Sequence, residues 1–139
     1  MNVYHGRPFC YLEQTLRSKL ESLTVSLKPI DKLHSFLVPY QHLAEDISTV
    51  CVTEFLNAKP ITKLGILILV DKIVREKYAS TPDLAAGIEE HLLVIFYDLK
   101  KYRQYTDFRN FVNNILWAWE ESKTFQNQIQ DLKFVFNKL

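Results

Sequence analysis

The stretch Lys63-Leu-Gly-Ile-Leu-Ile-Leu-Val-Asp-Lys-Ile-Val-Arg-Glu-Lys-Tyr78 decides the fold of this chain. Its apolar residues run from Leu64 to Val70 without a break. At about 100° per residue they cover most of the circumference of a helix, so the pattern predicts a helix that is buried on several sides. A buried β-strand is the alternative, but the pattern continues for longer than an ordinary strand. Pro60 lies where such a helix would begin.

One polar stripe remains on this expected helix, and it consists of Asp71, Lys72, Arg75 and Glu76. Asp71 and Arg75 are four residues apart, and so are Lys72 and Glu76. Opposite charges at this spacing pair on the surface of a helix. Any function that a partner can reach on this helix must therefore use the stripe.

The composition suits a single domain over residues 1–139, because 47% of the residues are hydrophobic and no linker-like segment interrupts the chain. The formal net charge of +1 argues against a general nucleic-acid binder. Cys10 and Cys51 are expected to be reduced core thiols, with a single disulfide as the alternative. The apolar run is too short to span a bilayer and no apolar signal segment opens the chain, so a soluble intracellular protein is expected.

Amphipathic patterns on both sides of the central stretch predict seven more helices, whereas no segment shows the alternation of a strand. Residues Met1–Arg7 are expected to form an irregular lead-in. Short connections imply that successive helices pack antiparallel, either in a bundle or in an α-superhelix. The expected helices run from Pro8 to about Leu23, from Ser26 to Pro39, from about Leu43 to Asn57, from Ser80 to Gly87, from Ile88 to about Arg103, from Thr106 onward, and from about Thr124 onward.

Residues that could carry chemistry are scattered along the chain. None of the four histidines forms an i, i+4 pair with another, and no HExxH, CxxC, GxSxG or phosphate-binding glycine motif occurs. Asp and Glu residues are spread so widely that no acid/base pair can be nominated. We therefore expect no metal site, no cofactor and no enzyme activity.

Two local features leave alternatives open. The segment Lys100-Lys-Tyr-Arg-Gln-Tyr105 mixes cations with aromatic rings, as an RNA-contacting patch does. The same cations could instead complement the carboxyl end of the helix that precedes them.

Trp117 and Trp119 are two residues apart on one expected helix, so they cannot face the same way. At least one indole is expected near the surface or in an interface.

Several of these residues follow a known pattern. Lys63-Leu64, Leu67, Val70-Asp71, Ile73 and Arg75 match a helix that reads Lys-Leu-Pro-x-Leu-Tyr-x-Leu-Asp-Ser-Ile-x-Lys-Asn, and Arg109 and Trp119 match an arginine near the start and a tryptophan near the end of a later helix. The chain thereby resembles the CTD-interacting domain, which binds the C-terminal heptad repeats of RNA polymerase II. The resemblance implies an all-α fold, a right-handed superhelix of about eight antiparallel helices.

The resemblance also implies a peptide groove, and this chain departs from it. Some family members read a phosphate on the second serine of the heptad with an arginine that aligns with Asn114 here. Losing that arginine removes a charge-assisted contact to phosphate. Asp71 matches the aspartate that, in the family, bonds to the hydroxyl group of the heptad tyrosine. The candidate peptide-binding or partner-binding residues are Asp71, Lys72, Arg75, Arg109, Asn114 and Trp117.

Pro8-Phe9 and Tyr40-Gln-His-Leu-Ala-Glu-Asp-Ile-Ser-Thr-Val-Cys51 are similar to a divergent version of this fold, the N-terminal domain of the gamma subunit of yeast-type CTD kinase I. This implies a nuclear, non-catalytic regulatory or assembly subunit, part of a longer protein. Its implied partners are a cyclin-dependent kinase and a cyclin, with the polymerase CTD itself as a further candidate. One alternative is a phospho-CTD reader in transcription termination or RNA processing. Another is a VHS/ENTH-like trafficking adaptor, against which the missing basic amphipathic segment counts. No membrane and no direct nucleic-acid partner is expected.

Overall fold

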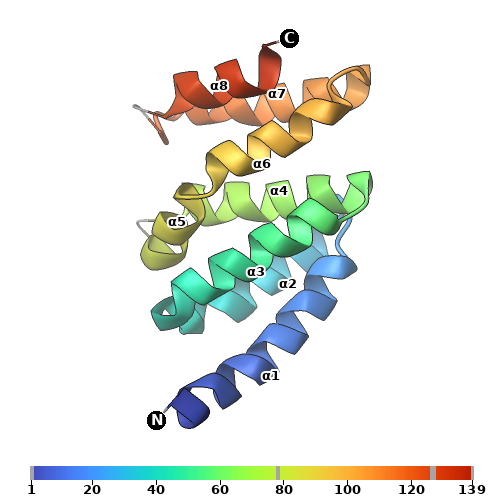
Figure 1. Ribbon diagram of the computed structural model, residues 1–139. Coiled ribbons are helices and arrows are strands. Elements are labelled where there is room, and N and C mark those ends of the chain that lie inside the picture. The colour runs from blue at the N-terminus through green and yellow to red at the C-terminus, as the bar shows by residue number, and fades with distance from the viewer. Residues whose placement is uncertain (1, 78, 126–127, 139) are drawn as a thin grey trace. The chain divides into compact units, whose positions relative to one another are not determined.

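The computed structural model describes residues 2–77, 79–125 and 128–138, and every regular element in these ranges is helical (Figure 1). The predicted all-α class is therefore confirmed, while the superhelical arrangement stays a prediction. The elements in order are α1 (Asn2–Glu21), α2 (Leu27–Leu37), the 3-10 helix η1 (Val38–Leu43), α3 (Ala44–Asn57), α4 (Pro60–Arg75), α5 (Pro82–Glu89), α6 (Leu92–Leu99), the 3-10 helix η2 (Lys100–Tyr102), α7 (Thr106–Glu121) and α8 (Ile129–Asn137).

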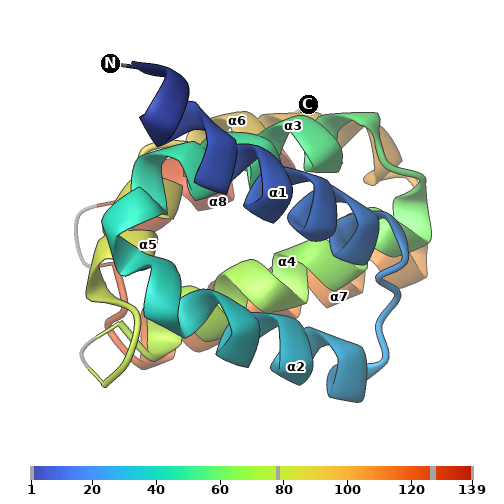
Figure 2. The same ribbon diagram turned by 90° about the horizontal axis from the view of Figure 1, so that it is seen from below.

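Two compact units make up the chain, Met1–Glu89 with α1 to α5 and Glu90–Leu139 with α6 to α8. In the first unit α3 packs on α1 and α5, and α2 and α4 lie side by side (Figure 2). In the second unit α8 packs on both α6 and α7. The prediction of one domain over the whole chain stays a prediction.

The start of α1 differs from the prediction. Helical backbone begins at Asn2, so the expected irregular lead-in and the expected start at Pro8 are wrong. A proline costs a helix one backbone donor, but it does not require the helix to begin there. The predicted start of the last helix near Thr124 is also wrong, because α8 begins at Ile129.

The boundary between α5 and α6 also differs from the prediction. Gly87 was expected to end α5, but the helix continues to Glu89, and Ile88 is a buried residue of α5 rather than the start of α6. A Cβ atom added at position 87 would overlap the hydroxyl group of Ser48 on α3. Gly87 therefore permits the close approach of two helices, and the chain turns only after Glu89.

α4 is buried on most of its circumference, as its sequence predicts. Six of its apolar side chains are at most 1% exposed, and these are Ile66, Leu67, Leu69, Val70, Ile73 and Val74. Gly65 lies against the connection between α1 and α2, where an added Cβ atom would overlap the carbonyl oxygen of Thr24. The proline of the family pattern has a Cβ atom and would not fit at this position without a shift of the backbone.

Lys63 is buried, which its charge did not lead us to expect. Its side chain is 1% exposed. The Nζ atom donates to the carbonyl oxygens of Phe55 at 2.9 Å and Leu56 at 3.2 Å, and it lies 4.8 Å from the centre of the Phe55 ring. These carbonyls belong to the last turn of α3, where the helix itself supplies no donor. A cation at this end also complements the helix dipole, so Lys63 ties the start of α4 to the end of α3.

We predict that Lys63→Met destabilises the protein, because methionine keeps an apolar stem but removes two charge-assisted hydrogen bonds. The free energy of unfolding should fall by about 1.5–3 kcal/mol, measured by urea denaturation followed by circular dichroism. Lys59→Met is the matched control, since Lys59 is exposed and its substitution should change stability by less than about 0.5 kcal/mol. Equal losses in the two variants would contradict the role of Lys63.

Candidate functional site

The polar stripe lies on the last turns of α4, and both predicted ion pairs of the stripe are present. Arg75 donates to Asp71 through two bonds, Nε to Oδ1 at 2.8 Å and Nη2 to Oδ2 at 2.7 Å. Lys72 Nζ lies 3.6 Å from Glu76 Oε2. The side-by-side bonds from Arg75 hold the Asp71 carboxylate in one orientation and use one acceptor site on each of its oxygens.

Asp31 of α2 is a further partner of the stripe, and the sequence pattern did not predict it. Lys72 Nζ donates to Asp31 Oδ1 at 2.9 Å, which is shorter than its distance to Glu76. This hydrogen bond is the main reason why the pKa of Lys72 is raised, and the charge of Glu76 adds to the effect. No spacing rule could have found Asp31, because it meets Lys72 only through the packing of α2 on α4.

His34 of α2 lies beside the same charges. Its side chain is buried, and Nε2 is 3.8 Å from Glu76 Oε2, too far for a hydrogen bond. Burial lowers the pKa of His34, because the charged imidazolium loses its hydration, and the nearby Glu76 opposes this shift only in part. The histidine is therefore expected to stay neutral near pH 7.

The stripe and its α2 neighbours contain three carboxylates and two cations, and each cation is within 4 Å of at least one carboxylate. A phosphate group could reach Lys72 or Arg75 only in competition with a carboxylate that each already contacts. Three carboxylates would repel it. The arrangement can accept a hydrogen bond or an opposite charge from a partner protein, but it offers little to a phosphate.

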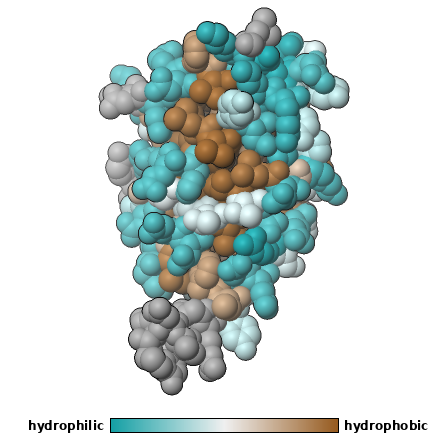
Figure 3. Space-filling model, in the orientation of Figure 1, coloured by the Kyte–Doolittle hydropathy of each residue, from teal (hydrophilic) through white to brown (hydrophobic). Residues whose placement is uncertain are grey.

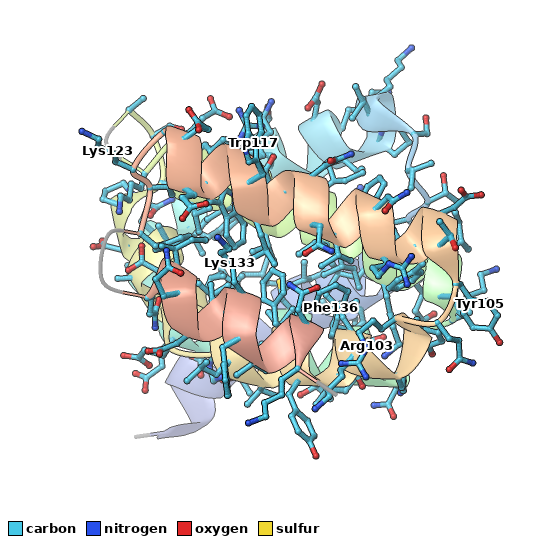
Figure 4. All side chains as sticks on the ribbon, turned by 90° about the horizontal axis from the view of Figure 1, so that it is seen from above. Arg103, Tyr105, Trp117, Lys123, Lys133 and Phe136 are labelled. Atoms are coloured by element: carbon cyan, nitrogen blue, oxygen red, sulfur yellow. The ribbon has the colours of Figure 1, made fainter. Side chains whose placement is uncertain are left out.

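The candidate residues of α7 do not form one site. Arg109 and Asn114 are five residues apart, which places them roughly 140° apart around the helix. Arg109 is half-buried, with Nη1 at 3.4 Å from the carbonyl oxygen of Arg103, whereas Asn114 is exposed. Trp117 shares a face with Asn114 and extends outward from α7 (Figure 4).

Trp117 and Trp119 have opposite environments, as their spacing predicts. Trp117 is 63% exposed and Trp119 is fully buried. The indole of Trp119 makes edge contacts with the rings of Phe96 at 5.7 Å and Phe125 at 5.1 Å between centroids. Trp119 therefore belongs to the core of the second unit, and Trp117 is available to a partner.

Exposed apolar residues gather on α6 and α8, where hydrophobic surface lies among hydrophilic surface (Figure 3). They are Leu93, Val94 and Tyr97 of α6 and Phe134 of α8. Leu93 is 44% exposed, whereas its neighbours Leu92 and Ile95 on α6 are buried. Leu56 of α3 is 39% exposed, whereas the adjacent Phe55 is fully buried.

The cysteines differ from each other. Cys51 is buried, as predicted, and burial raises the pKa of its thiol to about 12, so it stays protonated. Cys10 is exposed, and the prediction of a core thiol is wrong there.

Among the described residues, no group of His, Cys, Asp and Glu could hold a metal ion. None of the helices in the described ranges is long and apolar enough to cross a membrane.

Comparison with known proteins agrees with this architecture. A family model, the CID domain, matches residues 14–132. This is most of the chain, which therefore belongs to the CID domain family, a class of generally non-catalytic protein-interaction domains with a role at the C-terminal domain of RNA polymerase II. No curated protein matches the chain.

We predict that the two indoles respond differently to a soluble quencher. Trp119→Phe leaves only Trp117, whose fluorescence should be quenched efficiently by acrylamide because most of the ring is in solvent. Trp117→Phe leaves only Trp119, which should be shielded. Similar quenching constants in the two folded variants would contradict the placement of these side chains.

We predict that the stabilising effect of His34 depends on pH. Its folded pKa lies below the ordinary value near 6.5, so the unfolded chain binds the proton first as the pH falls. The contribution of the neutral imidazole is complete above about pH 6.5 and declines at lower pH. The stability difference between wild type and His34→Gln, from urea denaturation, should therefore shrink between pH 8 and pH 5.5. His42→Gln, which alters an exposed histidine, is the control; a difference that grows toward acid pH would refute the prediction.

Proposed function

We propose that this CID domain is a nuclear, non-catalytic regulatory or assembly module of an RNA polymerase II CTD kinase complex. Its partners would be a cyclin-dependent kinase and a cyclin. Membership of the CID family supports the connection with the polymerase CTD. The similarity of Pro8-Phe9 and of residues 40–51 to the gamma subunit of yeast-type CTD kinase I supports the particular complex.

The observation that supports the proposal is that the charges in the stripe of α4 pair with one another, Asp71 with Arg75 and Lys72 with Glu76. Asp71 is the residue that could accept a hydrogen bond from the hydroxyl of a heptad tyrosine, but each of its carboxylate oxygens already accepts one hydrogen bond from Arg75. One hydrogen bond to a charged acceptor contributes about 1.5–3 kcal/mol. Micromolar affinity requires about 8 kcal/mol, so Asp71 alone would not hold a peptide.

The other positions of the family pattern add few contacts that could hold a heptad peptide. Ile68 stands in place of the tyrosine and has no hydroxyl group. Lys72 is held between Asp31 and Glu76, so its charge is already compensated. Asn114, in place of the arginine, is exposed and carries no charge. These features together favour a CID domain that contacts proteins through surfaces other than a heptad groove.

We predict no saturable binding of two-repeat heptad peptides up to high micromolar concentration, whichever serine is phosphorylated. Fluorescence anisotropy with labelled peptides measures this directly. A low-micromolar isotherm that disappears in Asp71→Ala would refute the prediction. It would favour the alternative, a phospho-CTD reader in termination or RNA processing, for which the retained Asp71 is the supporting observation.

The assembly role is tested by affinity purification from the native cell and identification of the co-purifying chains. Recovery of a cyclin-dependent kinase and a cyclin is the expected result. Trp117→Ala should reduce their recovery if the exposed indole belongs to the partner surface. Tyr11→Ala is the matched control, because Tyr11 is an exposed aromatic residue on α1 (77% exposed). Recovery of termination factors without any kinase would refute the proposal.

A further inference from the structure

The second unit contains a pocket of a different character from the stripe. This basic pocket has a volume of about 350 Å³ and is lined by Lys100, Arg103, Gln104, Arg109 and Asn137. The lining comes from η2 and the turn after it, from the first turns of α7 and from the last turn of α8. It contains three cations and no carboxylate. Its chemistry is therefore that of an anion site.

The two arginines are held in place by contacts that leave most of their donors available. Arg103 Nη1 donates to the carbonyl oxygen of Phe136 at 3.3 Å and to that of Lys138. Arg109 Nη1 lies 3.4 Å from the carbonyl oxygen of Arg103. Each guanidinium thus uses one nitrogen for positioning, and Nε and Nη2 make no hydrogen bond within the described ranges. Arg103 bonds to carbonyl oxygens at the carboxyl end of α8, not at the end of α6.

The other lining residues complete the pocket. The side-chain amides of Asn137 and Asn113 exchange hydrogen bonds at 3.0 and 3.2 Å, and these bonds fix the orientation of Asn137 at the edge of the pocket. Lys100 lies 5.9 Å from the ring centre of Tyr97. In the described part of the chain, Lys100, Arg103 and Arg109 make no ion pair with a carboxylate. Three cations around one pocket repel each other, and an anion between them would remove that repulsion.

Two lysines outside the pocket are paired with carboxylates. Lys101, next in sequence, is paired with Asp98 at 3.1 Å, and Lys133 is paired with Glu120 at 3.0 Å. Lys123 lies at the other end of the α7–α8 pair from Arg103 (Figure 4). A nucleic acid requires a cationic track that follows several phosphates. A confined pocket with two guanidinium groups instead suits one phosphate group, which arginine binds through paired hydrogen bonds.

We propose that the basic pocket binds a single phosphomonoester group on a protein partner, that is, a phosphoserine or phosphothreonine side chain. The site is separate from the position of Asn114, where the resemblance places the phosphate-reading arginine, because Arg109 lies on another face of α7. It is also independent of the proposed place in a kinase complex. The dianion would sit between the free guanidinium donors of Arg103 and Arg109, with the Lys100 ammonium group beside it.

The test is a ¹⁵N NMR titration of the chain with a Gly/Ala peptide that carries one phosphoserine and no heptad sequence. The expected result is saturable shifts of backbone amides in residues 100–104, at 109 and at 137, absent with the unphosphorylated peptide. Arg109→Gln and Lys100→Gln should each raise Kd at least about tenfold, since each removes a charge-assisted contact. Arg103 is kept because it caps α8. Lys101→Gln removes the same charge from a residue outside the pocket and should change Kd less than about twofold.

Other outcomes would overturn the proposal. Equal weakening by Lys101→Gln and Arg109→Gln, with both spectra still well dispersed, would show general charge attraction in place of a site. Absence of saturable shifts at millimolar peptide would show that no such site exists. Tighter binding of inositol hexakisphosphate than of the phosphopeptide would identify the ligand as a small phosphorylated molecule and not as a protein. Tighter binding of a single-stranded RNA at equal phosphate concentration would move it to a nucleic acid.

Discussion

The burial of Lys63 against the end of α3 is the interaction on which the first unit depends. Its ammonium group supplies the donors that the last turn of α3 lacks, and in doing so it fixes where α4 starts relative to α3. The close contact between Gly65 and Thr24 then sets the distance of α4 from the α1–α2 connection. With its first turn held in this way, α4 places Lys72 next to Asp31 of α2.

The polar stripe of α4 and the basic pocket differ in what holds their cations. In the stripe of α4, Lys72 and Arg75 each already have a carboxylate partner, so an incoming anion would have to displace an existing ion pair. In the basic pocket the guanidinium groups of Arg103 and Arg109 are held by carbonyl oxygens, which position a cation without cancelling its charge. The first arrangement suits a surface recognised through shape and polar contact. The second leaves charge available for a ligand.

Under the proposed function, this contrast would allow a CID domain to act in a polymerase-associated complex without binding the heptad repeat. The family match establishes the class of the domain, and Asp71 and Lys72 already contact Arg75 and Asp31, with which a peptide would have to compete. Exposed groups outside the stripe, such as Trp117 and the apolar residues of α6 and α8, are free to contact other proteins. Specificity would then come from partner surfaces rather than from the heptad.

The sequence by itself determined the features that depend on neighbours within one helical turn. The all-α class, the start of α4 at Pro60, the pairing of Asp71 with Arg75 and the opposite directions of Trp117 and Trp119 all follow from the helical period. Only the tertiary structure decided which distant residues meet. The burial of Lys63, the helix continuing through Gly87, the pairing of Lys72 with Asp31 and the assembly of the basic pocket from η2, α7 and α8 all arise from packing between elements, which no local spacing encodes.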